Sequence, residues 1–134
     1  MQTFLPYVDF RKSLQCLDYR RLGKQRVEAM QIHNIITGKA KSKAWSKHPI
    51  VLMWQGYPNA LAEYHNIAIE EWLKRGYKNN MKKILINGKI KYPSWFGDIG
   101  FHSSHKSNLL RKNMEFYSRY RWEESDSLPY VWIV

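Results

Sequence analysis

The densest group of side chains suited to chemistry lies in residues 17–28, which read LDYRRLGKQRVE. Its cations are Arg20, Arg21, Lys24 and Arg26. A cation that neutralises a DNA phosphate releases condensed counterions, so clustered Lys and Arg are typical of phosphate-binding surfaces. On a helix, Arg20 and Lys24 share one face, whereas Asp18, Arg21 and Glu28 share another. We therefore predict DNA contacts from the four cations, with ion pairing inside the helix, such as Lys24 with Glu28, as the structural alternative.

A second group lies in residues 101–112, FHSSHKSNLLRK. Short polar donors near the start of a helix are suited to holding a phosphate. The side chains that we expect to face DNA are His102, His105, Arg111 and Lys112. A capped surface helix that buries His102 is the alternative interpretation. Two histidines do not complete a zinc site, which takes three or four ligands, so neither a metal nor another cofactor is predicted.

An aromatic run and a basic loop complete the candidate binding features. Phe116, Tyr117, Tyr120 and Trp122 are interleaved with Arg119 and Arg121. Rings and guanidinium groups together form stacking surfaces for unpaired bases, but in a chain with six Trp and nine Tyr core packing is the first interpretation. Residues 39–47, KAKSKAWSK, are a basic loop by composition.

The charge of the whole chain favours a polyanionic partner. Its 22 Lys and Arg against 11 Asp and Glu give a formal net charge of +11, and the isoelectric point is near 9.8. The apolar residues are spread along the chain and not gathered in one interfacial helix, so membrane association is not expected. The lone cysteine, Cys16, cannot form an internal disulfide and is expected to pack as a small apolar side chain in a cytoplasmic protein without a signal peptide.

Apolar spacing and capping residues predict the elements that hold these groups. Helices are expected over about residues 9–17, 19–37, 49–55, 58–75 and 103–120. The last of them is expected to begin with Ser103 or Ser104 as its cap and to break near Asn113.

The remaining segments predict an arm and a hairpin. The first eight residues, MQTFLPYV, are bulky and apolar around Pro6, so they are expected to lie extended against the body. The segment KILINGKIKYP predicts two short strands joined by a type I′ turn at Asn87 and Gly88, that is, a β-hairpin near residues 83–92. The predicted fold class is mainly all-α, a compact bundle of three main helices with an extended N-terminal arm and this small hairpin. At 134 residues, one core is expected, so residues 1–134 form a single domain and, we expect, a monomer.

The order of several segments resembles the phage pyrimidine-dimer DNA glycosylases, often called endonuclease V, and their bacterial relatives. The segments are YRRLGKQR, ITGK, EWLKRGYKN, HSSHKSNLLRK and YSRYRW, which occur in the same order from about residue 14 to residue 122. The resemblance implies an all-helical fold of three main helices with the N-terminal segment threaded between them. It also implies a DNA glycosylase with abasic-site lyase activity, in which the N-terminal α-amine attacks the sugar C1′ and forms an imine. An α-amine suits this chemistry because it is partly neutral at physiological pH.

Two positions depart from the family pattern. The family's catalytic Glu belongs to a YRELPR-like motif, and the matching position here is Arg21, which stays protonated. Glu28 lies two turns further along the same helical face and Asp18 one turn before it, so either is a candidate to replace that carboxylate. Family members expose a small second residue once Met is removed, whereas Gln2 hinders removal, so the reactive amine is expected to be that of Met1.

We therefore predict a base-excising enzyme that acts on damaged or modified pyrimidines in double-stranded DNA. Met1, Glu28 and Asp18 are its candidate catalytic residues, with Glu28 favoured over Asp18. A noncatalytic DNA- or RNA-binding protein on the same fold and another nucleic-acid enzyme are the alternatives. An amine that borohydride traps on abasic DNA would separate the glycosylase from the noncatalytic binder.

Overall fold

The fold is described from a computed structural model that covers residues 1–134. It is built from helices and contains no strand. The helices are α1 (Phe10–Gln15), α2 (Tyr19–Ile36), α3 (Pro49–Trp54), α4 (Pro58–Lys74), α5 (Ile99–Lys112) and α6 (Met114–Tyr117), followed by the 3₁₀ turn η1 (Ser118–Tyr120). The prediction of a mainly all-α protein with three main helices is confirmed, because α2, α4 and α5 are the long ones.

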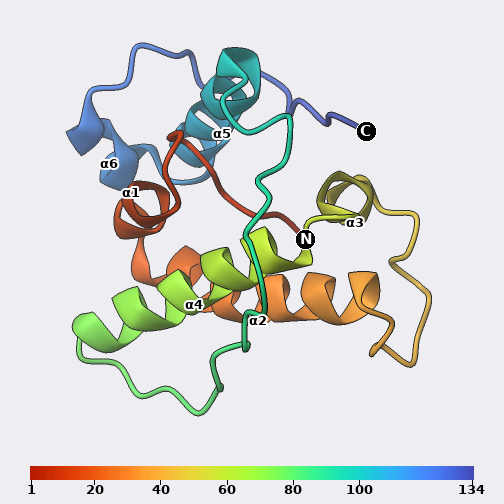
Figure 1. Ribbon diagram of the computed structural model, residues 1–134. Coiled ribbons are helices and arrows are strands. Elements are labelled where there is room, and N and C mark those ends of the chain that lie inside the picture. The colour runs from red at the N-terminus through yellow and green to blue at the C-terminus, as the bar shows by residue number, and fades with distance from the viewer.

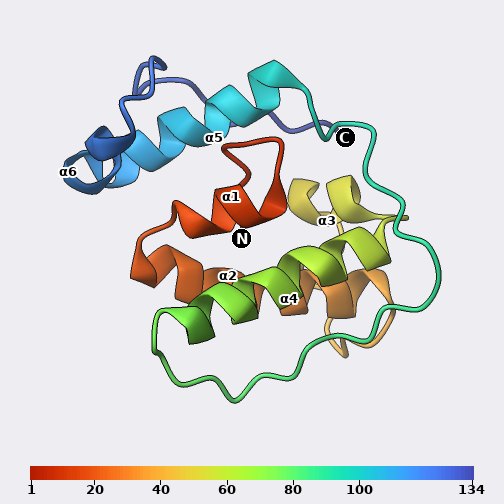
Figure 2. The same ribbon diagram turned by 60° about the vertical axis from the view of Figure 1, so that its left-hand side comes forward.

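Two helical layers enclose the N-terminal arm. The lower layer of Figure 1 is the pair α2 and α4, which pack along one another, and the upper layer is α5 with α6. The arm and α1 lie between these layers, and α3 closes one end; the view in Figure 2 shows the same order. The first residues of the chain therefore lie inside the molecule, as the family resemblance implied.

Local signals account for most helix boundaries. Asp9 caps α1 by accepting a hydrogen bond from the Lys12 N–H at 2.7 Å, and Pro49 and Pro58 occupy the first turns of α3 and α4. The break expected near Asn113 is present between α5 and α6. The predicted start of α5 is wrong, because Asp98 and not Ser103 or Ser104 accepts the capping bond, from the Phe101 N–H at 2.8 Å.

The predicted hairpin at residues 83–92 is also wrong. Gly88 does adopt the positive φ (83°) that an Asn-Gly turn favours, but the flanking residues do not pair with each other. Side chains of helix α4 instead form hydrogen bonds with some of the backbone N–H and carbonyl groups of these residues. The Asn66 side chain binds both the N–H and the carbonyl of Ile84, at 2.8 and 2.9 Å, and Asn59 donates to the Asn87 carbonyl at 2.9 Å. Side chains of α4 thus replace a partner strand along this segment, which runs beside the helix in Figure 2.

The core is rich in aromatic residues. Trp54, Tyr64, Tyr117 and Phe101 are among its largest fully buried side chains. Cys16 is buried as well, and burial raises the pKa of its thiol to about 12, so it is an apolar packing group at neutral pH. None of the helices is long and apolar enough to cross a membrane.

Candidate functional site

A cleft of about 620 Å³ opens where the N-terminal arm emerges between α2 and α5. Its lining combines the chain's first residues with most of the predicted cations. The lining residues are Met1, Gln2, Phe4, Arg20, Arg21, Lys24, Glu28, Lys112 and Tyr130. The structure thus brings together one candidate amine, one candidate carboxylate and four of the cations that the sequence suggested for DNA.

Glu28 lies directly beside the N-terminus. Its Oε2 accepts a hydrogen bond from the Gln2 N–H at 2.9 Å. Consecutive backbone nitrogens are about 3 to 4 Å apart, so the Met1 α-amine lies within about 7 Å of this oxygen. The cleft therefore holds a candidate nucleophile and a candidate proton acceptor at a separation that one sugar ring can bridge.

The amide of Gln25 fixes the arm one turn before Glu28. Its Oε1 accepts from the Phe4 N–H at 2.9 Å and from the Tyr64 hydroxyl at 2.6 Å, and its Nε2 donates to the Gln2 carbonyl at 2.9 Å. Gln25 is 1% exposed, so these bonds form in the dry interior. Sequence reasoning missed Gln25 because a single glutamine among charged residues carries no local signal of a buried partner.

His102 and His105 were predicted to contact DNA, but in the structure they contact the N-terminal arm. Both are buried, and both bind the backbone of Leu5: His105 Nδ1 accepts from its N–H at 2.9 Å, and His102 Nδ1 lies 2.6 Å from its carbonyl. His102 Nε2 accepts from the Gly97 N–H at 2.9 Å, so its proton resides on Nδ1, which donates to Leu5. Burial lowers the pKa of His102 and lowers that of His105 to about 3. Both side chains are therefore neutral and hold the arm in place. They are not cations that face a phosphate.

Asp18 is placed outside the cleft lining. Its Oδ1 accepts hydrogen bonds from the buried Tyr117 hydroxyl and from Arg21 Nη1, the latter at 3.1 Å. Burial opposes ionisation, but these donors outweigh it and hold the pKa of Asp18 below its usual range. Asp18 therefore orients Arg21 at the cleft wall, and Glu28 is the carboxylate that shares the cleft with Met1.

The cations divide into those that remain available and those already engaged. Arg20 and Lys24 are exposed at the cleft, and no carboxylate pairs with either. Lys112 joins them from the end of α5; partial burial and the neighbouring charges of Arg21, Arg111 and Lys24 lower its pKa. This concentration of positive charge suits a phosphodiester passing the cleft mouth.

Arg26 and Arg111 are engaged within the protein. The Arg26 guanidinium lies 4.2 Å from the centre of the Trp72 ring and donates to Asn79 Oδ1 at 2.6 Å. Arg111 donates to the carbonyl of Asp126 at 2.7 Å and so holds the C-terminal segment. Neither lines the cleft, in contrast to Arg20, Lys24 and Lys112.

The C-terminal segment contributes Tyr130, which sequence reasoning did not assign to the site. The segment follows α5: Ser107 Oγ accepts from the Leu128 N–H at 2.9 Å and Ser104 Oγ from the Val131 N–H at 3.2 Å. Between these two anchors, Tyr130 reaches the cleft wall. Burial raises the pKa of Tyr130 to about 12, so its hydroxyl is neutral at working pH.

A shallow apolar groove adjoins the cleft. It shares Arg20, Lys24 and Glu28 with the cleft and adds Tyr19, Gly23, Val27, Gln31 and Trp72. Gly23 is required for the close approach, because a Cβ there would stand 3.1 Å from the Trp72 ring. Trp72 in turn contacts Tyr77, with ring centroids 4.3 Å apart and the ring planes tilted by 31°. Arg26 and Tyr77 cover the Trp72 ring, so the exposed side chains of Tyr19 and Val27 supply the apolar surface of the groove.

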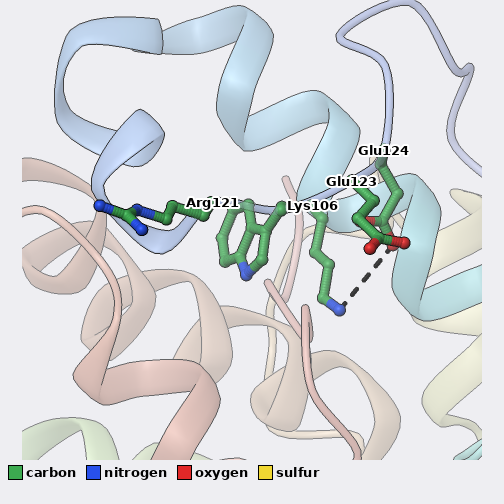
Figure 3. Close-up of a pocket in the computed structure, with 5 residues that line it drawn as sticks. Lys106, Arg121, Glu123 and Glu124 are labelled. Atoms are coloured by element: carbon green, nitrogen blue, oxygen red, sulfur yellow. Dashed lines mark ion pairs between the residues drawn. The ribbon is translucent and has the colours of Figure 1, made fainter.

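A second cleft, of about 490 Å³, lies between α5 and residues 121–124 (Figure 3). Lys106, Trp122 and Glu124 line it together with Arg121 and Glu123. Its charges are mixed, and Lys106 is already paired with Glu124 at 3.8 Å. The N-terminal amine does not reach it, so it offers no comparable chemistry. No cluster of three or more His, Cys, Asp or Glu side chains with the geometry of a metal site occurs in the structure.

Comparison with known proteins bears on the first of these clefts. A family model described as pyrimidine dimer DNA glycosylase matches residues 1–85. No curated protein and no solved structure matches the chain significantly. The matched stretch contains the arm, α2 with Glu28, and α4, whereas Lys112 and Tyr130 come from outside it.

Proposed function

This chain belongs to the pyrimidine dimer DNA glycosylase family, and from that membership we propose that it excises damaged pyrimidines through an imine formed by its N-terminal amine. Double-stranded DNA is the proposed substrate, and strand cleavage at the abasic sugar is the proposed second step. The observation that carries the proposal is the hydrogen bond from the Gln2 N–H to Glu28, which ties the α-amine to a carboxylate inside a cationic cleft.

In the proposed reaction, the lone pair of the Met1 nitrogen forms a bond to C1′ of the damaged nucleotide. The glycosidic C1′–N bond breaks, and its electron pair leaves with the base, which gains a proton. Transfer of an amine proton to the ring oxygen opens the sugar and leaves an iminium. Removal of a C2′ proton then expels the 3′ phosphate by β-elimination, and water hydrolyses the imine to release the amine.

Glu28 is the proposed catalytic carboxylate. Its negative charge stabilises the iminium and it accepts or returns protons during ring opening and elimination. Arg21, which occupies the family's usual carboxylate position, cannot do this because guanidinium stays protonated. The substitution of one position for the other is supported by Glu28 lying two turns further along the same face of α2 and directly contacting the arm.

The remaining cleft residues are proposed to bind DNA. Arg20, Lys24 and Lys112 neutralise phosphates on either side of the reacting sugar, and Arg21 is held toward the same mouth by Asp18. The groove beside Trp72 is proposed to receive a base rotated out of the helical stack, because the exposed side chains of Tyr19 and Val27 offer apolar contact without requiring a particular base edge.

Borohydride trapping on a duplex with one abasic site tests the proposal. Glu28→Gln keeps an acceptor for the Gln2 N–H but removes the charge, so the trapping rate is expected to fall about 100-fold or more. Glu115→Gln, an exposed residue away from the cleft, is the matched control and is expected to trap at the unmodified rate. An N-terminal extension is expected to abolish trapping while DNA binding persists. Trapping that survives the extension would rule out the N-terminal amine.

A further inference from the structure

The loop between α2 and α3 carries an uncompensated positive charge. Residues 39–47, here the lysine–tryptophan loop, contain Lys39, Lys41, Lys43 and Lys47, all exposed. No Asp or Glu occurs between Glu28 and Glu63, and no ion pair in the structure includes a loop lysine. The charge is therefore directed to solvent, where an anionic partner can reach it.

Trp45 stands exposed among these lysines. Nearly half of it (48%) is exposed to solvent. The loop that presents it is held by turns, with the Ser46 N–H donating to the Lys43 carbonyl at 3.1 Å and the His48 N–H donating to the Trp45 carbonyl at 3.0 Å. These turns fix the backbone that carries Trp45, and the exposed half of the indole is available to a partner.

A row of aromatic rings connects Trp45 to the candidate cleft. Tyr130, in the cleft wall, contacts Trp132 with centroids 5.5 Å apart. Trp132 contacts His48 at 5.7 Å, and His48 contacts Trp45 at 5.4 Å. Burial and, after it, the nearby Met1 ammonium lower the pKa of His48, which agrees with a position beside the N-terminus. His48, which follows the loop, therefore lies near the reacting end of the chain, and Figure 1 shows the N-terminus beside α3, the helix that the loop leads into.

Helix α2 sets the spacing between this loop and the cations at the cleft. Arg20 lies in its first turn, Glu28 near its middle, and the loop follows its last turn. At 1.5 Å per residue, its 18 residues span about 27 Å, with the loop about 15 Å beyond Glu28. One base pair of duplex DNA rises about 3.4 Å, so these lengths correspond to about eight and about four base pairs.

We propose that the lysine–tryptophan loop is a second DNA-binding element, which holds the strand leaving the cleft on the side away from Arg20. Its lysines bind backbone phosphates about four base pairs from the excised nucleotide, and Trp45 stacks on a base exposed at that distance. The proposal rests on the proposed function for the identity of the partner. A membrane surface fits less well, because binding there needs a broad apolar face and the loop offers one ring between alanines and lysines.

Binding to a duplex that contains a tetrahydrofuran abasic analogue tests the loop apart from catalysis, because that analogue cannot form an imine. Trp45→Ala is expected to weaken binding about 10-fold, and Trp45→Phe to restore most of the loss. The pair Lys41→Ala and Lys43→Ala is expected to lower the slope of log affinity against log salt by about two units. The matched control pair, Lys82→Ala and Lys89→Ala, removes equal charge from another exposed segment and is expected to leave the slope unchanged.

Shortened duplexes locate the contact. Two are used, each cut to three base pairs on one side of the analogue. On one of them the Trp45→Ala and unmodified proteins are expected to bind equally, whereas on the other the 10-fold difference remains. Equal slopes for the loop pair and the control pair, or a Trp45→Ala effect that no truncation removes, would overturn the proposal. So would loop variants that release the protein from anionic phosphatidylserine vesicles but bind DNA normally.

The outcome is separable from that of the proposed function. If the loop variants bind the analogue duplex normally while borohydride still traps the unmodified protein, the loop proposal alone fails. If the loop effects appear but blocking the N-terminus leaves trapping intact, the assignment of the Met1 amine as the nucleophile alone fails.

Discussion

Replacing Gln25 with Met is expected to loosen the N-terminal arm at a cost that the structure allows to be worked out. Met fills nearly the same volume but neither donates nor accepts the three hydrogen bonds of the amide. The Phe4 N–H and the Gln2 carbonyl lose their partners in the interior, while the Tyr64 hydroxyl retains the Phe4 carbonyl at 2.9 Å. Each unpaired buried group costs about 1–3 kcal/mol, so the sum is about 2–6 kcal/mol. The arm can shift and recover part of this cost, so we expect the free energy of unfolding to fall by about 3 kcal/mol.

The loss is measured by urea unfolding, with Gln31→Met as the matched control because Gln31 is exposed on the same helix. The control is expected to change the free energy of unfolding by less than about 0.5 kcal/mol. The Gln25 variant is also expected to trap abasic DNA more slowly at saturating DNA, since its amine is no longer held beside Glu28, and to bind the tetrahydrofuran duplex with unchanged affinity. A destabilisation below about 1 kcal/mol together with an unchanged trapping rate would refute the reasoning.

Three further predictions concern acid stability, the cleft wall and DNA affinity. Burial lowers the pKa of His105 to about 3, so as pH drops the unfolded chain binds a proton at this residue before the folded protein does. The free energy of unfolding is therefore expected to fall between about pH 6.5 and pH 3, by up to about 1.4 kcal/mol per pH unit. His105→Gln should make this decline shallower in urea titrations at several pH values. Tyr117→Phe removes a donor to Asp18, so the carboxyl pKa should rise, as NMR titration would show, and stability should drop by about 1–3 kcal/mol. Lys24→Ala should lower the salt slope of DNA binding by about one unit, and an unchanged slope would argue against a phosphate contact.

The helices were largely predictable because their signals are local. Asp9, Pro49 and Pro58 mark helix starts by the chemistry of the first turn alone. The hairpin prediction failed because its evidence was also local. Gly88 has the backbone conformation of the turn, yet whether strands form depends on which partner satisfies their backbone, and here Asn66 and other α4 side chains do so from about 20 residues away.

The sequence predicted several of the cations that line the cleft, but not the side chains that hold the N-terminal arm in place. Arg20, Lys24 and Lys112 reach one cleft, as their clustering and basic character suggested. The sequence around His102 and His105 does not distinguish a histidine that binds a phosphate from one that binds the backbone of the arm. Their role depends on the position of Leu5, which lies about 100 residues earlier in the sequence. No local spacing of residues predicts that contact.

The central claim is that the Met1 amine is the nucleophile, and the cleft contains rivals for that position. Lys24 and Lys112 both line it, and the lowered pKa of Lys112 makes it the stronger rival. Borohydride reduction on an abasic duplex, followed by proteolysis and mass mapping of the adduct, distinguishes the three amines. We expect the reduced sugar on the peptide that begins at Met1. An adduct on the peptide containing Lys112 or Lys24, with Met1 unmodified, would contradict the account.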